Sequence, residues 1–145
     1  MSSASKHNPA FDLTRIEDYL EAVYELIQTK GYARPVEIAE LLDIKTPSVT
    51  NMLQRLDKLG LVRYERYRGA TLTVKGERLA RFTQKKHLTL IKFLKIMGIE
   101  EATANLDAEG IEHHVHKSTI NRIGDFVEFV EKHPSWFKAF GAQEP

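Results

Sequence analysis

The chain has 145 residues, of which 42% are hydrophobic and 28% are charged, and it contains no cysteine. This length corresponds to one domain or to two small lobes, and the composition excludes a disordered or fibrous chain. The lack of cysteine excludes disulfides, thiolate metal sites and cysteine nucleophiles. No apolar run approaches the ~20 residues of a membrane span, and residues 1–13 lack the pattern of a signal peptide. We therefore expect a cytoplasmic protein without a membrane partner.

Charge is balanced over the whole chain, with a net charge of +1, but it is distributed unevenly. Residues 45–86 carry eleven basic and three acidic side chains, whereas residues 99–133 carry three basic and eight acidic ones. Such a division is typical of a protein in which one half binds a polyanion. Two ordinary solvated surfaces remain the alternative explanation.

The first predicted helix covers residues 14–30, because apolar side chains recur there at helical spacing. Thr14 and Glu17 form a capping box at its start, and Gly31 is a typical C-terminal stop. Residues 35–42 predict a second, short helix with a proline in its first turn.

A third helix is predicted over residues 46–59, with Thr46 as the N-cap and Pro47 at the first helical position. The strand-like runs 61–67 and 70–73 then predict a β-hairpin. This order of elements is that of a winged helix-turn-helix, in which residues 46–59 are the recognition helix and the hairpin is the wing.

The second half is predicted to be helical throughout. Helices are expected over residues 75–96, 100–115 (with a possible break near 105–107) and 118–133, the last with Ser118 as its cap. The aromatic tail that follows has no clear assignment. We therefore predict a mainly α-helical chain with two domains, a DNA-binding domain over 1–74 and a helical dimerisation and metal-binding domain over 75–145.

The predicted recognition helix and wing carry the side chains expected to contact DNA. Polar and basic groups on the outer face of a helix can read base edges or hold phosphates in the major groove, and a basic wing can contact phosphates or the minor groove. The candidates are Thr46, Pro47, Ser48, Thr50, Asn51, Gln54, Arg55, Lys58, Arg66 and Arg68. The alternatives are a merely solvated helix face, or a winged helix that binds only protein.

A group of acidic and histidine residues lies outside this region. If residues 100–115 and the following turn are one helix, Glu109, Glu112, His113 and His116 share one face of it. Carboxylate oxygen together with imidazole nitrogen suits Mn²⁺, Fe²⁺, Co²⁺ or Zn²⁺. Asp18 and Glu21, with the same i,i+3 spacing, and His87 are further donors. Each of these groups alone is also compatible with an ordinary solvated or satisfied side chain.

The sequence gives little support to an enzyme. It has no HExxH motif, no glycine-rich phosphate loop and no nucleophile elbow, and it supplies no evident general base beside the metal donors. We expect neither catalysis nor an organic small-molecule substrate.

Several stretches together resemble the diphtheria toxin repressor type of metal-dependent transcription regulators, and within it the manganese-transport regulator branch. The matching stretches are Glu17-Asp-Tyr-Leu-Glu21, Lys30-Gly-Tyr-Ala-Arg34, Pro47-Ser-Val-Thr50, Tyr64-Glu-Arg-Tyr-Arg-Gly69, Leu72-Thr-Val-Lys-Gly76, Glu109-Gly-Ile-Glu-His-His114 and Asn121-Arg-Ile-Gly-Asp125.

This resemblance implies a homodimer that binds operator DNA and represses manganese uptake genes when its metal site is filled. It implies two Mn²⁺ ions per chain, with Fe²⁺, Co²⁺, Zn²⁺ or Cd²⁺ as possible substitutes. The implied ligands are Asp18, Glu21, His87, Glu109, Glu112 and His113. His116 departs from the family pattern, and it could support a ligand or admit zinc. The competing hypothesis is a metal-independent winged-helix regulator that is gated by an organic ligand or a protein partner.

Overall fold

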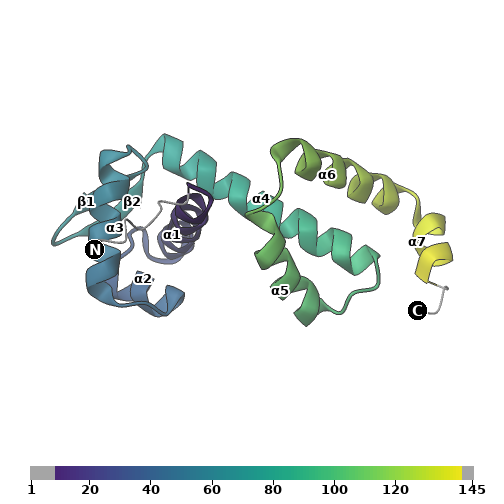
Figure 1. Cartoon of the computed structure of the whole chain (residues 1–145), viewed down its shortest axis with the longest axis horizontal. Helices are drawn as coiled ribbons and strands as arrows, with labels where there is room; N and C mark the ends of the chain where they lie inside the picture. The colour runs from purple at the N-terminus through teal and green to yellow at the C-terminus, as the bar shows by residue number, and fades with distance from the viewer. Residues whose placement is uncertain (1–8, 142–145) are drawn as a thin grey trace, which may run out of the picture. The chain divides into compact units, whose positions relative to one another are not determined.

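The computed structural model describes residues 9–141, with side chains described from residue 15 onward. The chain divides into two compact units, residues 1–83 and 84–145. None of the described helices is long and apolar enough to cross a membrane. Figure 1 gives the element labels used below.

Unit 1 contains three helices and a hairpin, followed by the first part of a long helix. The helices are α1 (Pro9–Lys30), α2 (Pro35–Leu42) and α3 (Thr46–Lys58), and the strands are β1 (Val62–Glu65) and β2 (Gly69–Leu72). The two strands pair antiparallel, with Val62 opposite Leu72 and Glu65 opposite Gly69. The predicted winged helix-turn-helix is therefore confirmed.

The core of unit 1 forms where the apolar stripes of its helices meet the inner face of the hairpin. Leu20, Ile38, Val49, Leu53 and Leu56 are all fully buried there. These residues recur at helical spacing within each element, which is why the periodicity of the sequence located the helices correctly.

Helix α1 begins at Pro9, five residues before the predicted start. The predicted capping box at Thr14 and Glu17 is therefore wrong, since both positions lie inside the helix. Glu17 is instead buried, at 4% exposure. The Thr14 side chain is outside the part of the chain whose side chains are described.

Helix α3 also begins one residue earlier than predicted. Its N-cap is Lys45 rather than Thr46, so Thr46 and Pro47 are the first two helical residues. Proline is tolerated there because the N–H groups of the first turn have no partner within the helix. In the hairpin, residues 66–68 form the turn, so β1 ends two residues before the predicted end at residue 67 and β2 begins one residue before the predicted start at residue 70.

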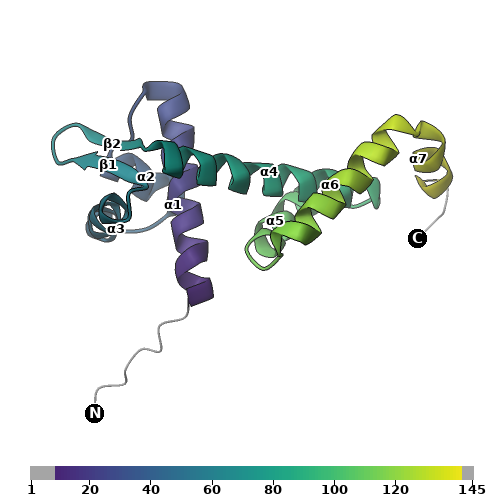
Figure 2. The same ribbon diagram turned by 90° about the horizontal axis from the view of Figure 1, so that it is seen from above.

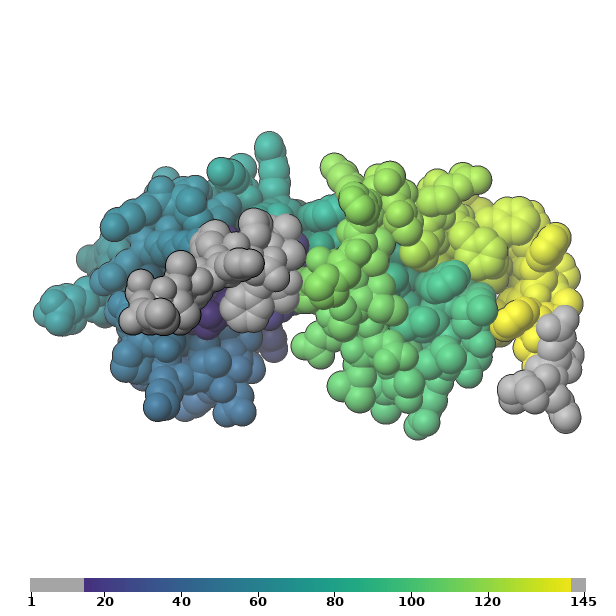
Figure 3. All heavy atoms as spheres, viewed as in Figure 1, coloured from purple at the N-terminus to yellow at the C-terminus, as the bar shows by residue number. Residues whose placement is uncertain are grey.

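Helix α4 (Val74–Ile96) starts in unit 1 and continues into unit 2, as Figure 2 shows. Unit 2 also contains α5 (Glu101–Glu112), α6 (Lys117–Lys132) and α7 (Pro134–Gly141). Its core is small and centres on Leu90, Ala108 and Ile120. Helix α5 is continuous, so the possible break near residues 105–107 does not occur. The tail forms α7, whose side chains lie exposed on the surface (Figure 3).

Candidate nucleic-acid and metal sites

The outer face of α3 carries most of the predicted DNA-contacting residues. Its inner face is fixed by Val49, Leu53 and Leu56, which are fully buried. Helical spacing then turns the intervening polar positions outward. The candidates with exposed side chains are Pro47, Ser48, Asn51, Gln54, Arg55 and Lys58, whereas Thr46 and Thr50 are half-buried.

The hydroxyl of Thr50 has a local partner. Its Oγ1 donates a hydrogen bond to the carbonyl oxygen of Thr46 at 3.3 Å. Thr50 is therefore less available than its neighbours for contact with a base. That any of these residues touches DNA remains a prediction.

The wing is joined to the C-terminal end of α3. The amide of Tyr64 in β1 donates to Asp57 Oδ2 at 2.8 Å. Beside this contact lies an open pocket of about 500 Å³, lined by Gln54, Asp57, Lys58, Tyr64 and Arg66. The recognition helix and the wing therefore form one continuous surface with basic groups on both sides of the pocket.

The turn of the wing projects from unit 1 (Figure 3). Arg66 and Arg68 are exposed, as predicted, and Tyr67 between them is 90% exposed. The Arg66 guanidinium lies 5.9 Å from the centre of the Tyr67 ring, and Arg68 Nε lies 3.5 Å from Glu65 Oε2. An exposed ion pair of this kind is weak, so Glu65 does little to prevent Arg68 from binding an anion.

In unit 2, three of the predicted metal ligands come together around the carboxylate of Glu112. Glu112 Oε2 lies 2.9 Å from His87 Nδ1, and Glu112 Oε1 lies 3.3 Å from His113 Nε2. The Glu112 side chain is only 1% exposed. An ionised carboxylate is costly to bury without polar partners, and the two imidazoles provide such partners here.

Lys86 supports this arrangement, and the sequence analysis missed it. Its Nζ is buried and donates a hydrogen bond to the Glu112 carbonyl oxygen at 3.3 Å, which joins α4 to the last residue of α5. A contact between residues 26 positions apart leaves no periodic signal in the sequence. A lysine in a basic stretch is normally read as solvent-exposed.

The remaining predicted ligands are placed differently. Glu109 is exposed on α5, whereas Asp18 and Glu21 are half-buried on one face of α1 in unit 1. Over the described side chains, no group of three or more Asp, Glu and His residues has an arrangement that could hold a metal ion. The donor chemistry around Glu112 nevertheless fits a divalent cation, because it offers carboxylate oxygen and imidazole nitrogen and no sulfur.

The predicted position of His116 on the same helix face is wrong. Helix α5 ends at Glu112, the chain turns through residues 113–115, and His116 becomes the N-cap of α6. Ser118 is consequently not the cap of that helix. Val115 in the turn and Ile120 in α6 belong to the hydrophobic cluster around Leu90 and Ala108. His116 itself is exposed.

Comparison with known proteins gives a match across both units. Residues 13–70 match the family described as "Iron dependent repressor, N-terminal DNA binding domain", and residues 73–136 match "Iron dependent repressor, metal binding and dimerisation domain". The second description argues against a metal-independent winged-helix regulator.

A similar relative is the HTH-type transcriptional regulator MntR of Listeria monocytogenes serotype 4a. It is 46% identical over 129 residues, which are 89% of this chain and 91% of the relative.

Two solved structures of regulators are also similar to this chain. The manganese regulator SloR is similar with a TM-score of 0.69 at 30% identity, and ScaR with bound Zn²⁺ has a TM-score of 0.68 at 28% identity. In both cases the match covers 79% of this chain and 54% of the other, so this chain spans about half the length of those regulators.

Proposed function

Because this chain belongs to the iron dependent repressor family, it is a metal-responsive DNA-binding transcriptional regulator and not an enzyme, and we propose that the metal to which it responds is Mn²⁺. The observation that carries the proposal is the buried Glu112 carboxylate between His87 and His113, in the half of the chain that matches a metal-binding domain. Oxygen donors favour Mn²⁺ over softer ions, and no cysteine or thiolate competes. The similarity to the manganese regulator SloR supports the same metal.

The proposed site holds two Mn²⁺ ions per chain. Fe²⁺, Co²⁺, Zn²⁺ and Cd²⁺ are the expected substitutes, since each accepts oxygen and nitrogen donors. The proposed ligands are Asp18, Glu21, His87, Glu109, Glu112 and His113. Bound Mn²⁺ supplies positive charge that neutralises the four carboxylates, which would repel one another without it.

Metal binding is linked to DNA binding because the proposed ligands come from both units. Asp18 and Glu21 come from α1 of the DNA-binding unit, whereas the other four ligands come from unit 2. Ligands from both units would fix the DNA-binding unit, and in a homodimer this would hold the two α3 helices at a spacing suited to successive major grooves. By linkage, operator DNA must then tighten Mn²⁺ binding by the same factor. The genes under control are proposed to be those for manganese uptake.

The first test is a titration of chelator-treated protein with Mn²⁺, in which the free ion is followed by its EPR signal. We expect uptake of two ions per chain, together with a rise in affinity for operator DNA over the same range of Mn²⁺ concentration. Uptake of Zn²⁺ but not Mn²⁺ under the same conditions would contradict the assignment of the metal.

Arg68→Ala tests the role of the wing. Because Arg68 is exposed on the turn beside Gly69, we expect it to contact phosphate and not a base. The variant should weaken binding to operator and to random duplex DNA about equally. It should make the slope of log K against log salt concentration less steep by about 1.8, which is about 0.9 for each chain of the homodimer. Fluorescence anisotropy at several salt concentrations measures this slope. Loss of affinity at the operator alone would instead assign base recognition to Arg68.

A further inference from the structure

The hairpin of the wing also has an outward face. Of the residues predicted to contact DNA, Arg68 alone lies on that face. The segment before α2 joins the hairpin through Ala33, which exchanges two backbone hydrogen bonds with Ala70, at 2.9 and 2.7 Å. Ala33, Val62 and Ala70 are buried on the inner face. Because side chains alternate along a strand, Tyr32, Arg34 and Arg63 lie on the outer face.

This outer face forms a pocket of about 530 Å³. Six side chains that can bind a phosphate group or pack against a sugar line it: Tyr32, Arg34, Arg63, Tyr67, Arg68 and Thr71. The floor is close to the backbone at Gly69, which has φ +101° and where a Cβ would lie 2.7 Å from the carbonyl oxygen of Ala33. Glycine at this position therefore permits the close approach of the Ala33 segment to β2.

The pocket has a positive charge balance. Three arginines line it against one acid, Glu65, which is paired at the rim with Arg68. The nearest acid on α2, Glu37, is bound by Lys30, and the hydrogen bond from Lys30 lowers the pKa of Glu37. The Arg34 guanidinium lies 5.3 Å from the centre of the Tyr32 ring, which orients it by a cation–π contact.

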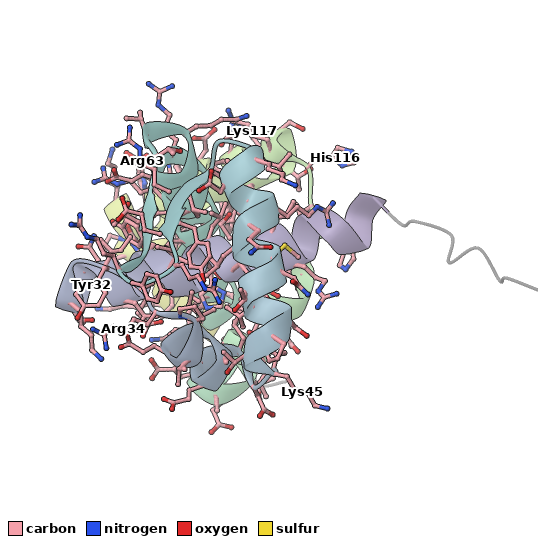
Figure 4. The ribbon with its side chains drawn as sticks, turned by 90° about the vertical axis from the view of Figure 1, so that its left-hand side faces the viewer. Tyr32, Arg34, Lys45, Arg63, His116 and Lys117 are labelled. Carbon is pink, nitrogen blue, oxygen red and sulfur yellow. The ribbon has the colours of Figure 1, made fainter. Side chains whose placement is uncertain are left out.

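The pocket and α3 lie on opposite faces of the hairpin, because Arg63 lines this pocket whereas Tyr64 and Arg66 line the one beside α3. Figure 4 shows Tyr32, Arg34 and Arg63 together to one side of α3, with Lys45 at the beginning of that helix. The hairpin carries both this pocket and the one beside α3 that Lys58 and Arg66 line. Basic groups on both faces of the hairpin suit an extended polyanion better than a compact ligand.

We propose that the outer face of the wing, through Arg34 and Arg63, binds the sugar–phosphate backbone of DNA outside the segment that α3 contacts. Arginine suits this role because its planar guanidinium matches the phosphate oxygens, and Tyr32 and Tyr67 provide rings that can pack on the sugar. The contact carries no sequence information and serves to position the protein on the duplex. The inference rests on the DNA-binding function and extends its surface.

The test compares the wild type with Arg34→Ala/Arg63→Ala on a random-sequence 30-base-pair duplex at saturating Mn²⁺. Two lost phosphate contacts per chain, four in the homodimer, should make the slope of log K against log salt concentration less steep by about 3.6. The variant Arg34→Lys/Arg63→Lys should recover most of the slope, because the charge is retained. Arg122→Ala, which removes an exposed arginine in unit 2, should leave the slope unchanged. Circular dichroism establishes that each variant is folded.

The possible outcomes distinguish a failure of the DNA-binding function from a failure of this site alone. Wild-type protein that binds no duplex would overturn the DNA-binding function and this site with it. Wild-type binding with an unchanged slope in the double alanine variant would overturn the site alone. If equilibrium dialysis then detects AMP bound to the wild type but not to this variant, the pocket takes a free nucleotide instead of DNA.

Discussion

Glu112→Ala should abolish the Mn²⁺-dependent rise in DNA affinity while the chain remains folded. The carboxylate is the group that joins His87 to His113, and its loss removes the central oxygen donor of the proposed site. We expect Mn²⁺ affinity to fall on the order of 100-fold or more, since even residues that only support a metal ligand contribute 10- to 100-fold. EPR titration measures the metal affinity, and fluorescence anisotropy with and without Mn²⁺ measures DNA binding.

The effect of this substitution can be separated from a general loss of structure. Glu112→Gln keeps the volume of the side chain but removes its charge, so it should lose the Mn²⁺ response to a similar extent. Asp107→Ala removes an exposed acid from the same helix and should leave both measurements unchanged. A Glu112→Ala protein that still responds fully to Mn²⁺ would show that the ligands have been assigned wrongly.

Gly76→Ala should destabilise unit 1 by about 3 kcal/mol, a large part of the stability of a small domain. A Cβ at this position would lie 1.9 Å from the carbonyl oxygen of Leu61. That oxygen cannot move easily, because it accepts a hydrogen bond from the Thr73 amide at 3.1 Å. The Gly76 amide in turn donates to Thr73 Oγ1 at 3.1 Å, which fixes the first turn of α4. Thermal or urea denaturation measures the loss.

A second helical glycine provides the control. Gly110 lies within α5, and an added Cβ there meets no atom within 4 Å. Gly110→Ala should therefore be neutral or stabilising by up to about 1 kcal/mol, because alanine favours the helix. If both glycine variants lose stability equally, the contact with the Leu61 carbonyl oxygen does not determine the cost, because helix propensity favours alanine at both positions.

The sequence predicted most of unit 1 because its signals are local. Apolar spacing located α2 and α3, the strand-like runs located the hairpin, and the exposed positions of α3 follow from the three buried residues opposite them. Local signals were less reliable at helix ends. The expected capping box at Thr14 and Glu17 failed because α1 continues to Pro9, and nothing in the spacing of apolar residues marks such an extension.

In unit 2, patterns within single segments of the sequence predicted less of the structure. Helical spacing placed Glu109, Glu112, His113 and His116 on one face, yet α5 ends at Glu112 and Glu109 is exposed. After the turn, Val115 and Ile120 lie in the same hydrophobic cluster as Leu90 of α4 and Ala108 of α5. A pattern within one segment contains no information about such contacts.

The amino-acid pattern thus predicted the kinds of chemistry present: a basic winged helix, oxygen and nitrogen metal donors, and no thiolate. Which of these groups meet could be learned only from the folded chain. The Glu112 carboxylate is buried between His87 and His113, and Lys86 supports it. The outward pocket brings Arg34 and Arg63 together. Both arrangements join residues that are far apart in the chain. The physical reason is that spacing fixes the face of a helix or strand on which a side chain lies, whereas its partner is fixed by how the elements pack.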